Sequence, residues 1–302
     1  MTLQQSTQYS QSISPHDRQN AREVSLRSLK PKFLNDLTRI GARSDGGYVL
    51  NQASVQQSQY LLSFGINDEW SFEAEFLERK PQIKVFCFDH SVSKAIFKAR
   101  MQHSLHDIFS PKLAAHILSL KRARVRQAFS EFRHWRRVHS QFSRFVSNPN
   151  VNFYSKGISN QKSDQYTTFS EAFRLMSPAN PPENSVFVKI DIEQSEYRIL
   201  PDVLLFQNYI NGFVVEFHAL DILWDSFIEI TQELNRYFEI THIHGNNYGG
   251  LIPNSDVPCV LEVTFLKRAL IPPNRAYPSV TYPIAELDFP NDLRKKDYLL
   301  TF

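Results

Sequence analysis

Short apolar runs alternate with amphipathic segments through most of the chain. The apolar runs cover residues 60–64, 84–90, 151–159, 185–193, 210–220, 238–244 and 258–266. Residues 69–80 and 166–176 lie between such runs and carry apolar positions at helical spacing. Parallel strands need helical crossovers, which also cover both faces of the sheet. The pattern therefore predicts an α/β fold with a Rossmann-like, doubly wound, mostly parallel seven-stranded sheet.

The first 22 residues are rich in Gln and Ser and hold few apolar residues. They predict a flexible tail at 1–22 and a single domain at 23–302, in which residues 23–41 supply a helix and an approach strand. The tail lacks the hydrophobic stretch of a signal peptide or a membrane span. Cys87 and Cys259 lie inside apolar runs, which indicates buried thiols in a reducing compartment. We therefore expect a cytoplasmic protein.

Residues 91–147 separate the second and third predicted strands. Their apolar positions follow steps of three or four residues: Val125, Phe129, Phe132, Trp135, Val138, Phe142 and Phe145. This spacing predicts a helical insertion whose apolar stripe docks on the domain. The outward side then carries most of the arginines: Arg122, Arg124, Arg126, Arg133, Arg136 and Arg137.

Charge is concentrated in this insertion. Residues 91–146 hold twelve Lys and Arg against two Asp and Glu, which leaves 22 against 29 for the rest of the chain. A basic helical surface attracts phosphates or acidic glycans, although many such surfaces are only solvated. Because the insertion starts near the second strand end, we expect it to lie over the acceptor pocket. There it would recognise substrate or make a peripheral membrane contact, and a nucleic-acid partner is the less favoured alternative.

Ligands of open parallel sheets bind beyond the carboxyl ends of the strands. Gly65 follows the first predicted strand, and glycine is scarce, with nine in 302 residues. Asp89 ends the second strand, 24 residues later, which is the placement of a carboxylate that binds ribose hydroxyls. The loop SFGINDEW has one glycine followed by an acid, and so lacks the GxGxxG of a dinucleotide site. S-adenosylmethionine, which carries no phosphate, fits this loop better.

Acids and histidines gather at the later strand ends. Asp191 and Glu193 lie two residues apart, which predicts that they share one face of the fourth strand. Glu216 and His218 repeat the spacing on the fifth strand, and the sixth ends with His242 and His244. The candidate catalytic residues are Asp191, Glu216, His218 and His244, with either histidine able to serve as the base for a hydroxyl acceptor. Alternatively, Mg²⁺ or another hard cation would bind Asp191, Glu193 and Glu216.

Several pieces resemble the FkbM-type methyltransferase family, a branch of the class I S-adenosylmethionine-dependent methyltransferases. They span roughly residues 38–298: IGARSDGGYVL, LLSFGINDEWSFE, VFCFDH, FVKIDIEQSEYRIL, VVEFH, HIHGNNYGG, VLEVTFL and LDFPNDLRKKD. The resemblance implies that Phe64 to Asn67 bracket the methionine part, that Asp89 holds the ribose and that the 157–164 loop approaches the adenine. The expected cofactor-binding set is Phe64, Gly65, Asn67, Asp89, His90, Gly157 and Asp191. Gln194-Ser195-Glu196 stands where the family usually has Gly-Ala-Glu, and Asn67 where it commonly has a second glycine.

The leading hypothesis is thus an S-adenosylmethionine-dependent methyltransferase (EC 2.1.1 class) that methylates a hydroxyl of a sugar, glycan or small molecule. A catalytically idle domain of this fold that binds an anionic polymer or a membrane is the second hypothesis. An RNA or protein methyltransferase is the third, favoured by the basic segment but without a nucleic-acid motif elsewhere.

Overall fold

The computed structural model describes residues 29–111, 121–177, 179–271 and 280–302. The tail predicted at 1–22 lies outside these residues. No helix among the described residues is long and apolar enough to cross a membrane.

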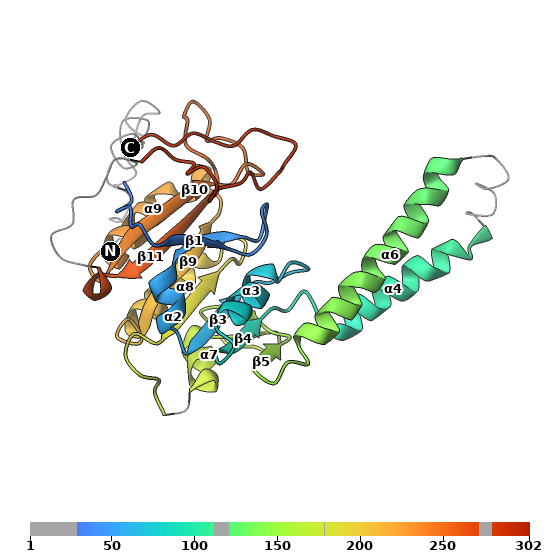
Figure 1. Ribbon diagram of the computed structural model, residues 1–302, viewed down its shortest axis with the longest axis horizontal. Helices are drawn as coiled ribbons and strands as arrows, with labels where there is room; N and C mark the ends of the chain where they lie inside the picture. The colour runs from blue at the N-terminus through green and yellow to red at the C-terminus, as the bar shows by residue number, and fades with distance from the viewer. Residues whose placement is uncertain (1–28, 112–120, 178, 272–279) are drawn as a thin grey trace, which may run out of the picture.

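A seven-stranded sheet forms the centre of the protein (Figure 1). Its strands, in chain order, are β3 (Tyr60–Phe64), β4 (Lys84–Phe88), β5 (Val151–Tyr154), β8 (Val186–Ile190), β9 (Ile210–Phe217), β10 (Phe238–Gly245) and β11 (Leu261–Lys267). The spatial order is β10-β11-β9-β8-β3-β4-β5. The strands from β5 to β9 pair in parallel, whereas β11 runs antiparallel to both β9 and β10. The predicted mostly parallel, doubly wound sheet is confirmed.

Helices cover both faces because the central strands are apolar on both sides. One face packs against α7 (Phe169–Met176), α8 (Glu196–Leu205) and α9 (Leu220–Leu234). The other packs against α2 (Gln52–Gln57), α3 (Ser71–Arg79) and a two-stranded antiparallel sheet of β1 (Leu37–Ile40) and β2 (Tyr48–Asn51). Successive residues of β8 alternate between these layers: Phe187 joins the second and Val188 the first. Each layer is therefore a core of its own on one sheet face.

Local sequence signals set several boundaries. Thr168 caps α7 by accepting a hydrogen bond from the Glu171 amide (3.2 Å), and Phe169, Phe173 and Met176 turn toward the sheet. The third apolar run, predicted as one strand over 151–159, divides into β5 and β6 (Gly157–Ile158). β6 pairs with β7 (Tyr166–Thr167) in a separate small sheet. A short 3₁₀ helix, Arg268–Leu270, follows β11.

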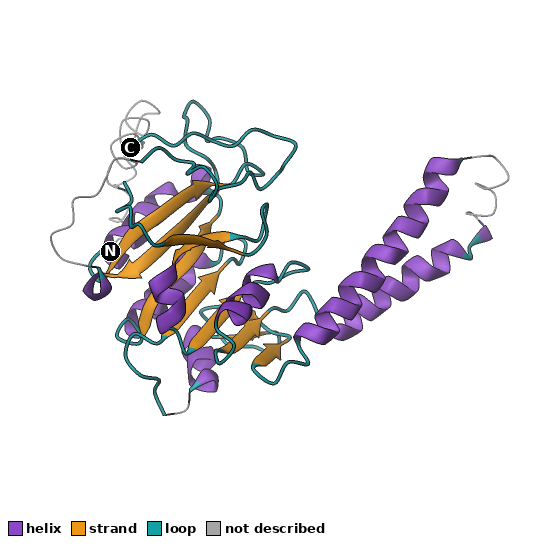
Figure 2. Cartoon of the chain, viewed as in Figure 1, coloured by secondary structure: helices purple, strands orange, loops and turns teal. Residues whose placement is uncertain are grey.

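The predicted insertion is a helical hairpin of α4 (Lys94–Ile108) and α6 (Arg122–Phe145) that projects away from the sheet (Figures 1 and 2). Only the carboxyl-terminal part of α6 docks on the domain, where Val138, Phe142 and Phe145 are buried. Trp70 packs against Phe142 at this base. Farther out, α6 runs along α4 instead, and Phe129 is 43% exposed. The expectation that the whole apolar stripe docks on the domain is therefore wrong, because most of it is used inside the hairpin.

Candidate functional site

A cavity of about 860 Å³ opens at the carboxyl ends of β3, β4, β8 and β9. The chain leaves β3 toward β4 and β5 on one side and later returns to β8 and β9 on the other. Adjacent strands β3 and β8 thus mark the topological switch point, where doubly wound sheets bind ligands. The cavity volume lies in the range of about 300–1,000 Å³ typical of small-molecule and cofactor sites.

Acidic side chains dominate the cavity wall. Seven carboxyl residues line it: Asp45, Asp68, Glu69, Asp89, Asp191, Glu193 and Glu216. Among the residues that the structure describes, Lys189 is the only lysine or arginine in this lining. Such a wall attracts cations and hydroxyl donors and repels phosphate groups. Among the described residues, none of α4 or α6 lines the cavity and only Ser91 of the predicted insertion does, so the expectation that the insertion covers the pocket is wrong.

Gly65 allows two strand ends to pass close together. Its φ is +76°, and a Cβ there would lie 1.7 Å from the carbonyl oxygen of Asp191. The same crossing is bridged by the Asp191 amide, which donates to the Phe64 carbonyl at 3.0 Å. Glycine is therefore required here by the approach of another chain segment, as well as offering bare backbone to a ligand. Phe64 itself is fully buried in the core and does not line the cavity.

Asp89 braces the loop after β3. One carboxylate oxygen accepts hydrogen bonds from the amides of Ile66 (2.9 Å) and Asn67 (2.8 Å). The other accepts from the amide and the hydroxyl of Ser91, both at 2.7 Å. Four donors from the chain occupy the lone pairs of this carboxylate. Asp89 lies on the cavity wall as expected, and in the structure its hydrogen bonds hold the loop after β3.

The far end of the cavity is aromatic. Tyr166 and His90 face each other, with ring centroids 5.1 Å apart, and the Tyr166 hydroxyl lies 3.4 Å from His90 Nε2. Gly157 lies beneath them, since a Cβ there would come within 2.7 Å of the tyrosine ring. Phe88 and Ile158 complete this part of the wall. A planar, apolar group such as a nucleobase fits these surfaces.

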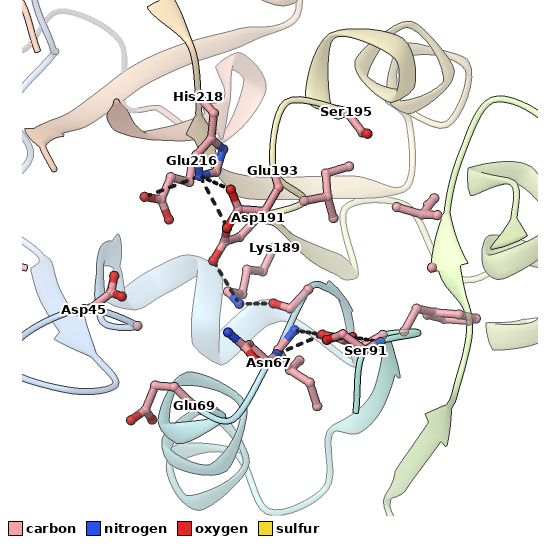
Figure 3. Close-up of a pocket in the computed structure, with 18 of the residues that line it drawn as sticks. Asp45, Asn67, Glu69, Ser91, Lys189, Asp191, Glu193, Ser195, Glu216 and His218 are labelled. Carbon is pink, nitrogen blue, oxygen red and sulfur yellow. Dashed lines mark hydrogen bonds and ion pairs between the residues drawn. The ribbon is translucent and has the colours of Figure 1, made fainter. Parts of the chain in front are cut away.

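Lys189 is the buried counterion of the site. Its ammonium group donates to the Gly65 carbonyl oxygen (2.5 Å) and lies 3.9 Å from Asp191 (Figure 3). It also lies 3.6 Å from Glu73. Burial lowers the pKa of Lys189, but the carboxylates of Glu73, Asp191 and Glu216 outweigh burial and raise it. Lys189 therefore stays charged and balances part of the acidic wall. Sequence reasoning missed this residue, although its place two residues before Asp191 puts both on one strand face.

Asp191 and Glu216 face each other across the ends of β8 and β9. The Tyr48 hydroxyl, from β2, donates to Asp191 at 3.1 Å and to Glu216 at 3.4 Å. The Asn246 amide donates to the second oxygen of Glu216 at 2.6 Å. Burial, followed by Asp191 and Glu262, raises the pKa of Glu216 well above its usual range. Glu216 therefore holds its proton more tightly than an ordinary glutamic acid.

His218 is fixed by a buried carboxylate. Its Nδ1 lies 2.8 Å from Oε1 of Glu196, which is fully buried at the start of α8. Nε2 faces the cavity, 3.8 Å from Glu216 and 3.9 Å from Asp191. Burial lowers the pKa of His218, but the hydrogen bond to Glu196 and the nearby carboxylates outweigh it and raise the pKa. This is the arrangement of a histidine base that is held in one tautomer by an acid.

Glu193 does not share a strand face with Asp191. β8 ends at Ile190, and Glu193 and Gln194 have φ values of +52° and +75°. This turn leaves the Glu193 side chain 87% exposed, with Oε2 3.8 Å from His218 Nε2. Gln194 occupies a left-handed position that suits the glycine of the FkbM-type pattern. Glu196, which follows, accepts hydrogen bonds from the amides of Ile192 (3.3 Å) and Gln194 (3.2 Å).

In the described part of the chain, two groups of side chains are close enough to share a cation. One consists of Asp191, Glu216 and His218, and the other of Asp45, Glu216 and Glu262, each with ligand atoms within 4.8 Å of one another. The predicted metal set of Asp191, Glu193 and Glu216 differs from both, since His218 stands in place of the exposed Glu193. Lys189, 3.9 Å from Asp191, already supplies a positive charge to the first group.

His244 lies in a buried ion-pair chain rather than on the cavity wall. Its Nδ1 contacts Glu262 at 3.0 Å, and its Nε2 contacts Asp297 at 3.0 Å. Burial lowers its pKa, but the hydrogen bonds to Asp297 and Glu262 outweigh burial and raise the pKa to about 10. A histidine that keeps its proton at neutral pH is not available as a base. His242 pairs with Asp288 at 3.1 Å in the same layer.

The sequence matches no family model and no curated protein. Among solved structures, the chain is similar to the Methanococcus jannaschii fibrillarin pre-rRNA processing protein, with 8% identity over 71% of this chain and 68% of that chain and a TM-score of 0.35. It is also similar to a putative S-adenosylmethionine dependent methyltransferase from Listeria monocytogenes (11% identity, 70% of this chain and 93% of that chain, TM-score 0.33). A third similar structure is that of precorrin-6y C5,15-methyltransferase from Geobacter metallireducens (11% identity, 85% of this chain and 91% of that chain, TM-score 0.31). Similarities this low carry no argument about function, which rests on the cavity itself.

Proposed function

We propose that the protein is an S-adenosylmethionine-dependent methyltransferase that methylates a hydroxyl group. The observation that carries this proposal is the cavity at the switch point, lined by seven carboxyl residues and one lysine. A sulfonium cation complements this wall, whereas the pyrophosphate of a dinucleotide is repelled by it. The motif pieces that resemble the FkbM-type family support the same conclusion and the narrower family assignment.

The residues present fit the cofactor in size and chemistry. Gly65 leaves the loop after β3 without a side chain beside the amino acid part, and Tyr166 and His90 offer ring surfaces for the adenine. S-adenosylmethionine, when bound, supplies a methyl group activated by its positive sulfur. Asp89 holds the loop in shape and becomes a ribose ligand only by giving up a bond to Ser91.

His218 is the base in this proposal. Its Nε2 faces the cavity and takes the proton from the acceptor hydroxyl, while Glu196 holds Nδ1 and stabilises the imidazolium that results. Asp191, at 3.9 Å from Nε2, orients the acceptor by accepting a hydrogen bond from a neighbouring hydroxyl, which leaves the proton of the reacting hydroxyl to His218. Glu216 helps to fix Asp191 through their shared donor, Tyr48.

The same wall indicates the kind of acceptor. Carboxylates and the Asn246 amide accept hydrogen bonds from several hydroxyl groups at once, and they disfavour anions. We therefore favour a neutral, polyhydroxylated acceptor such as a sugar, a glycan or a polyol-like small molecule.

A cation bound by Asp191, Glu216 and His218 would use the same nitrogen that acts as base. Lys189 already neutralises Asp191, and this disfavours a second positive charge beside it. We therefore expect S-adenosylmethionine binding and methyl transfer to persist after dialysis against EDTA. Loss of transfer in EDTA, with recovery on addition of Mg²⁺, would assign His218 to the metal instead.

Calorimetry with S-adenosylmethionine tests the proposal on the full chain. The wild-type protein should bind, and Asp89→Ala should weaken binding at least about tenfold, since four hydrogen bonds that shape the loop are lost. Asp225→Ala, at an exposed position of α9, is the matched control and should bind as the wild type does. No binding by the wild-type chain refutes the proposal, and equal binding by all three places the cofactor elsewhere.

Methyl transfer from labelled S-adenosylmethionine into a fractionated lysate then identifies the acceptor class. We expect label in the small-molecule or glycan fraction. Label confined to RNA or protein would contradict the acceptor inferred from the acidic wall. Binding without any transfer would favour a catalytically idle domain.

A further inference from the structure

The hairpin carries a single row of arginines along its outer side. Arg122, Arg126, Arg133, Arg137 and Arg144 follow one another at alternate steps of four and seven residues on α6. Both steps return to nearly the same side of an α-helix. All five arginines are exposed, whereas the buried residues Val138, Phe142 and Phe145 lie on the opposite side. At 1.5 Å per residue the row is about 33 Å long.

This charge is not neutralised by the protein. Within the described part of the chain, no ion pair joins any arginine of α6 to a carboxylate. The one acid of α6, Glu131, lies off the row and contacts Gln127 instead. These arginines do not line the cavity, because the hairpin extends away from the sheet (Figure 2). An uncompensated row of this length makes a positive field along the helix, which attracts anionic partners.

The residues on the outer side of α6 also indicate the chemistry of the partner. A helix that lies in a membrane interface presents a broad apolar side to the lipid. On the outer side of α6 the residues between the arginines include Ser130 and Ser140, and only Phe129 at its border is apolar. Arginine guanidinium groups bind phosphate oxygens in bidentate geometry, and a row about 33 Å long covers about ten base pairs at 3.4 Å each.

We propose that the arginine row of α6 is a docking surface for the phosphate backbone of a nucleic acid duplex. We expect it to bind without sequence preference, because contacts to phosphate oxygens carry no sequence information. This proposal does not depend on methyl transfer, since the cavity and the row share no residue.

Binding of the full chain to a 20-base-pair RNA duplex and to the matching DNA duplex tests the proposal. Fluorescence anisotropy would compare the wild type with a row variant (Arg126→Gln, Arg133→Gln, Arg137→Gln) over a range of salt concentrations. A control variant (Lys84→Gln, Arg174→Gln, Arg198→Gln) removes the same charge from exposed positions outside the hairpin. The two duplexes distinguish RNA from DNA as the source of the phosphates.

We expect the row variant to bind at least about tenfold more weakly than the wild type, while the control variant changes little. The slope of log affinity against log salt should become shallower by about two to three, since each lost phosphate contact removes about 0.9. A third variant with Arg→Lys at the same three positions keeps the charge and should retain most of the slope. It also tests the row if the glutamine variant is poorly folded.

Equal losses in the row and control variants would overturn the proposal, because they would show only an effect of net charge. Absence of duplex binding would overturn it as well. Binding of phosphatidylserine vesicles that requires the row, without duplex binding, would replace it with a membrane contact.

Discussion

The His218–Glu196 pair makes a prediction that needs no acceptor. The raised pKa of His218 should appear as a titration midpoint above about 6.5, the usual value for histidine. Glu196→Gln removes the negative charge but keeps an oxygen for Nδ1–H, and it should move this midpoint downward. Nuclear magnetic resonance of ¹³C-labelled histidine measures both values.

The same pair sets the pH dependence of activity. The base must be neutral, so the rate should fall as pH drops through the pKa of His218, and Glu196→Gln should shift this fall to lower pH. His218→Asn should lower kcat by about 10²-fold or more while leaving cofactor affinity within a few fold. A variant that kept full kcat, or a titration unaffected by Glu196→Gln, would argue against histidine as the base.

His244 makes a prediction about stability. Its pKa of about 10 in the folded protein exceeds the value of about 6.5 for an unfolded chain. The protonated pair with Glu262 and Asp297 therefore contributes fully below pH 6.5, and this contribution is lost as pH rises through 10. His244→Gln should unfold at lower denaturant concentration at pH 7, with a smaller change between pH 7 and 10 than the wild type. His103→Gln, at an exposed position of α4, should match the wild type at both pH values.

At the scale of single residues, the sequence indicated the strand ends but not the partners. Asp191, Glu216 and His218 could be named because they end neighbouring strands. Glu196 could not be assigned to His218, since the contact depends on how the turn after β8 places the first residue of α8. Glu262 was missed for a similar reason: only the antiparallel register sets it beside both Glu216 and His244.

At the scale of elements, the crossing of the β3 and β8 ends makes a prediction about glycine. Gly65→Ala combines a positive φ with a Cβ 1.7 Å from the Asp191 carbonyl, whereas Gly250→Ala has the same φ of about +75° and open space. The second change should cost about 1–2 kcal/mol of unfolding free energy, and the first clearly more. Denaturant unfolding of both variants measures the difference. Equal costs would mean that the backbone conformation alone requires glycine.

The strands could be predicted because buried parallel strands are apolar throughout and form short runs of typical strand length. The residues at which the strands end could not be predicted. Asp191 and Glu193 continue the alternation of β8 in sequence, yet the left-handed turn at Glu193 and Gln194 stops it after Ile190. The docking of the insertion was also mispredicted. An apolar stripe on α6 packs equally well on a sheet or on a second helix, and periodicity does not distinguish the two.

At the scale of the whole molecule, opposite charges are kept apart. The acidic cavity and the basic hairpin lie in different parts of the protein, so the net charge of +3 describes neither. A cationic ligand is attracted to the cavity and repelled by the hairpin, and an anionic ligand shows the opposite preference. The segregation could be predicted from the distribution of charged residues, whereas the position of the hairpin relative to the cavity required the fold.

The aromatic base of the hairpin joins these two parts mechanically. Trp70 packs against Phe97, Phe142 and Phe145, and it directly follows the Asp68–Glu69 segment of the cavity wall. The base of the arm therefore meets the domain directly beside the cavity wall at Trp70, and it also packs on Phe153 of β5 through Phe142. By thermodynamic linkage, any change that a partner on the arm makes to affinity in the cavity is returned by the same factor. The affinity of the cavity for its ligand would then differ between the free protein and the protein with a partner bound to the hairpin.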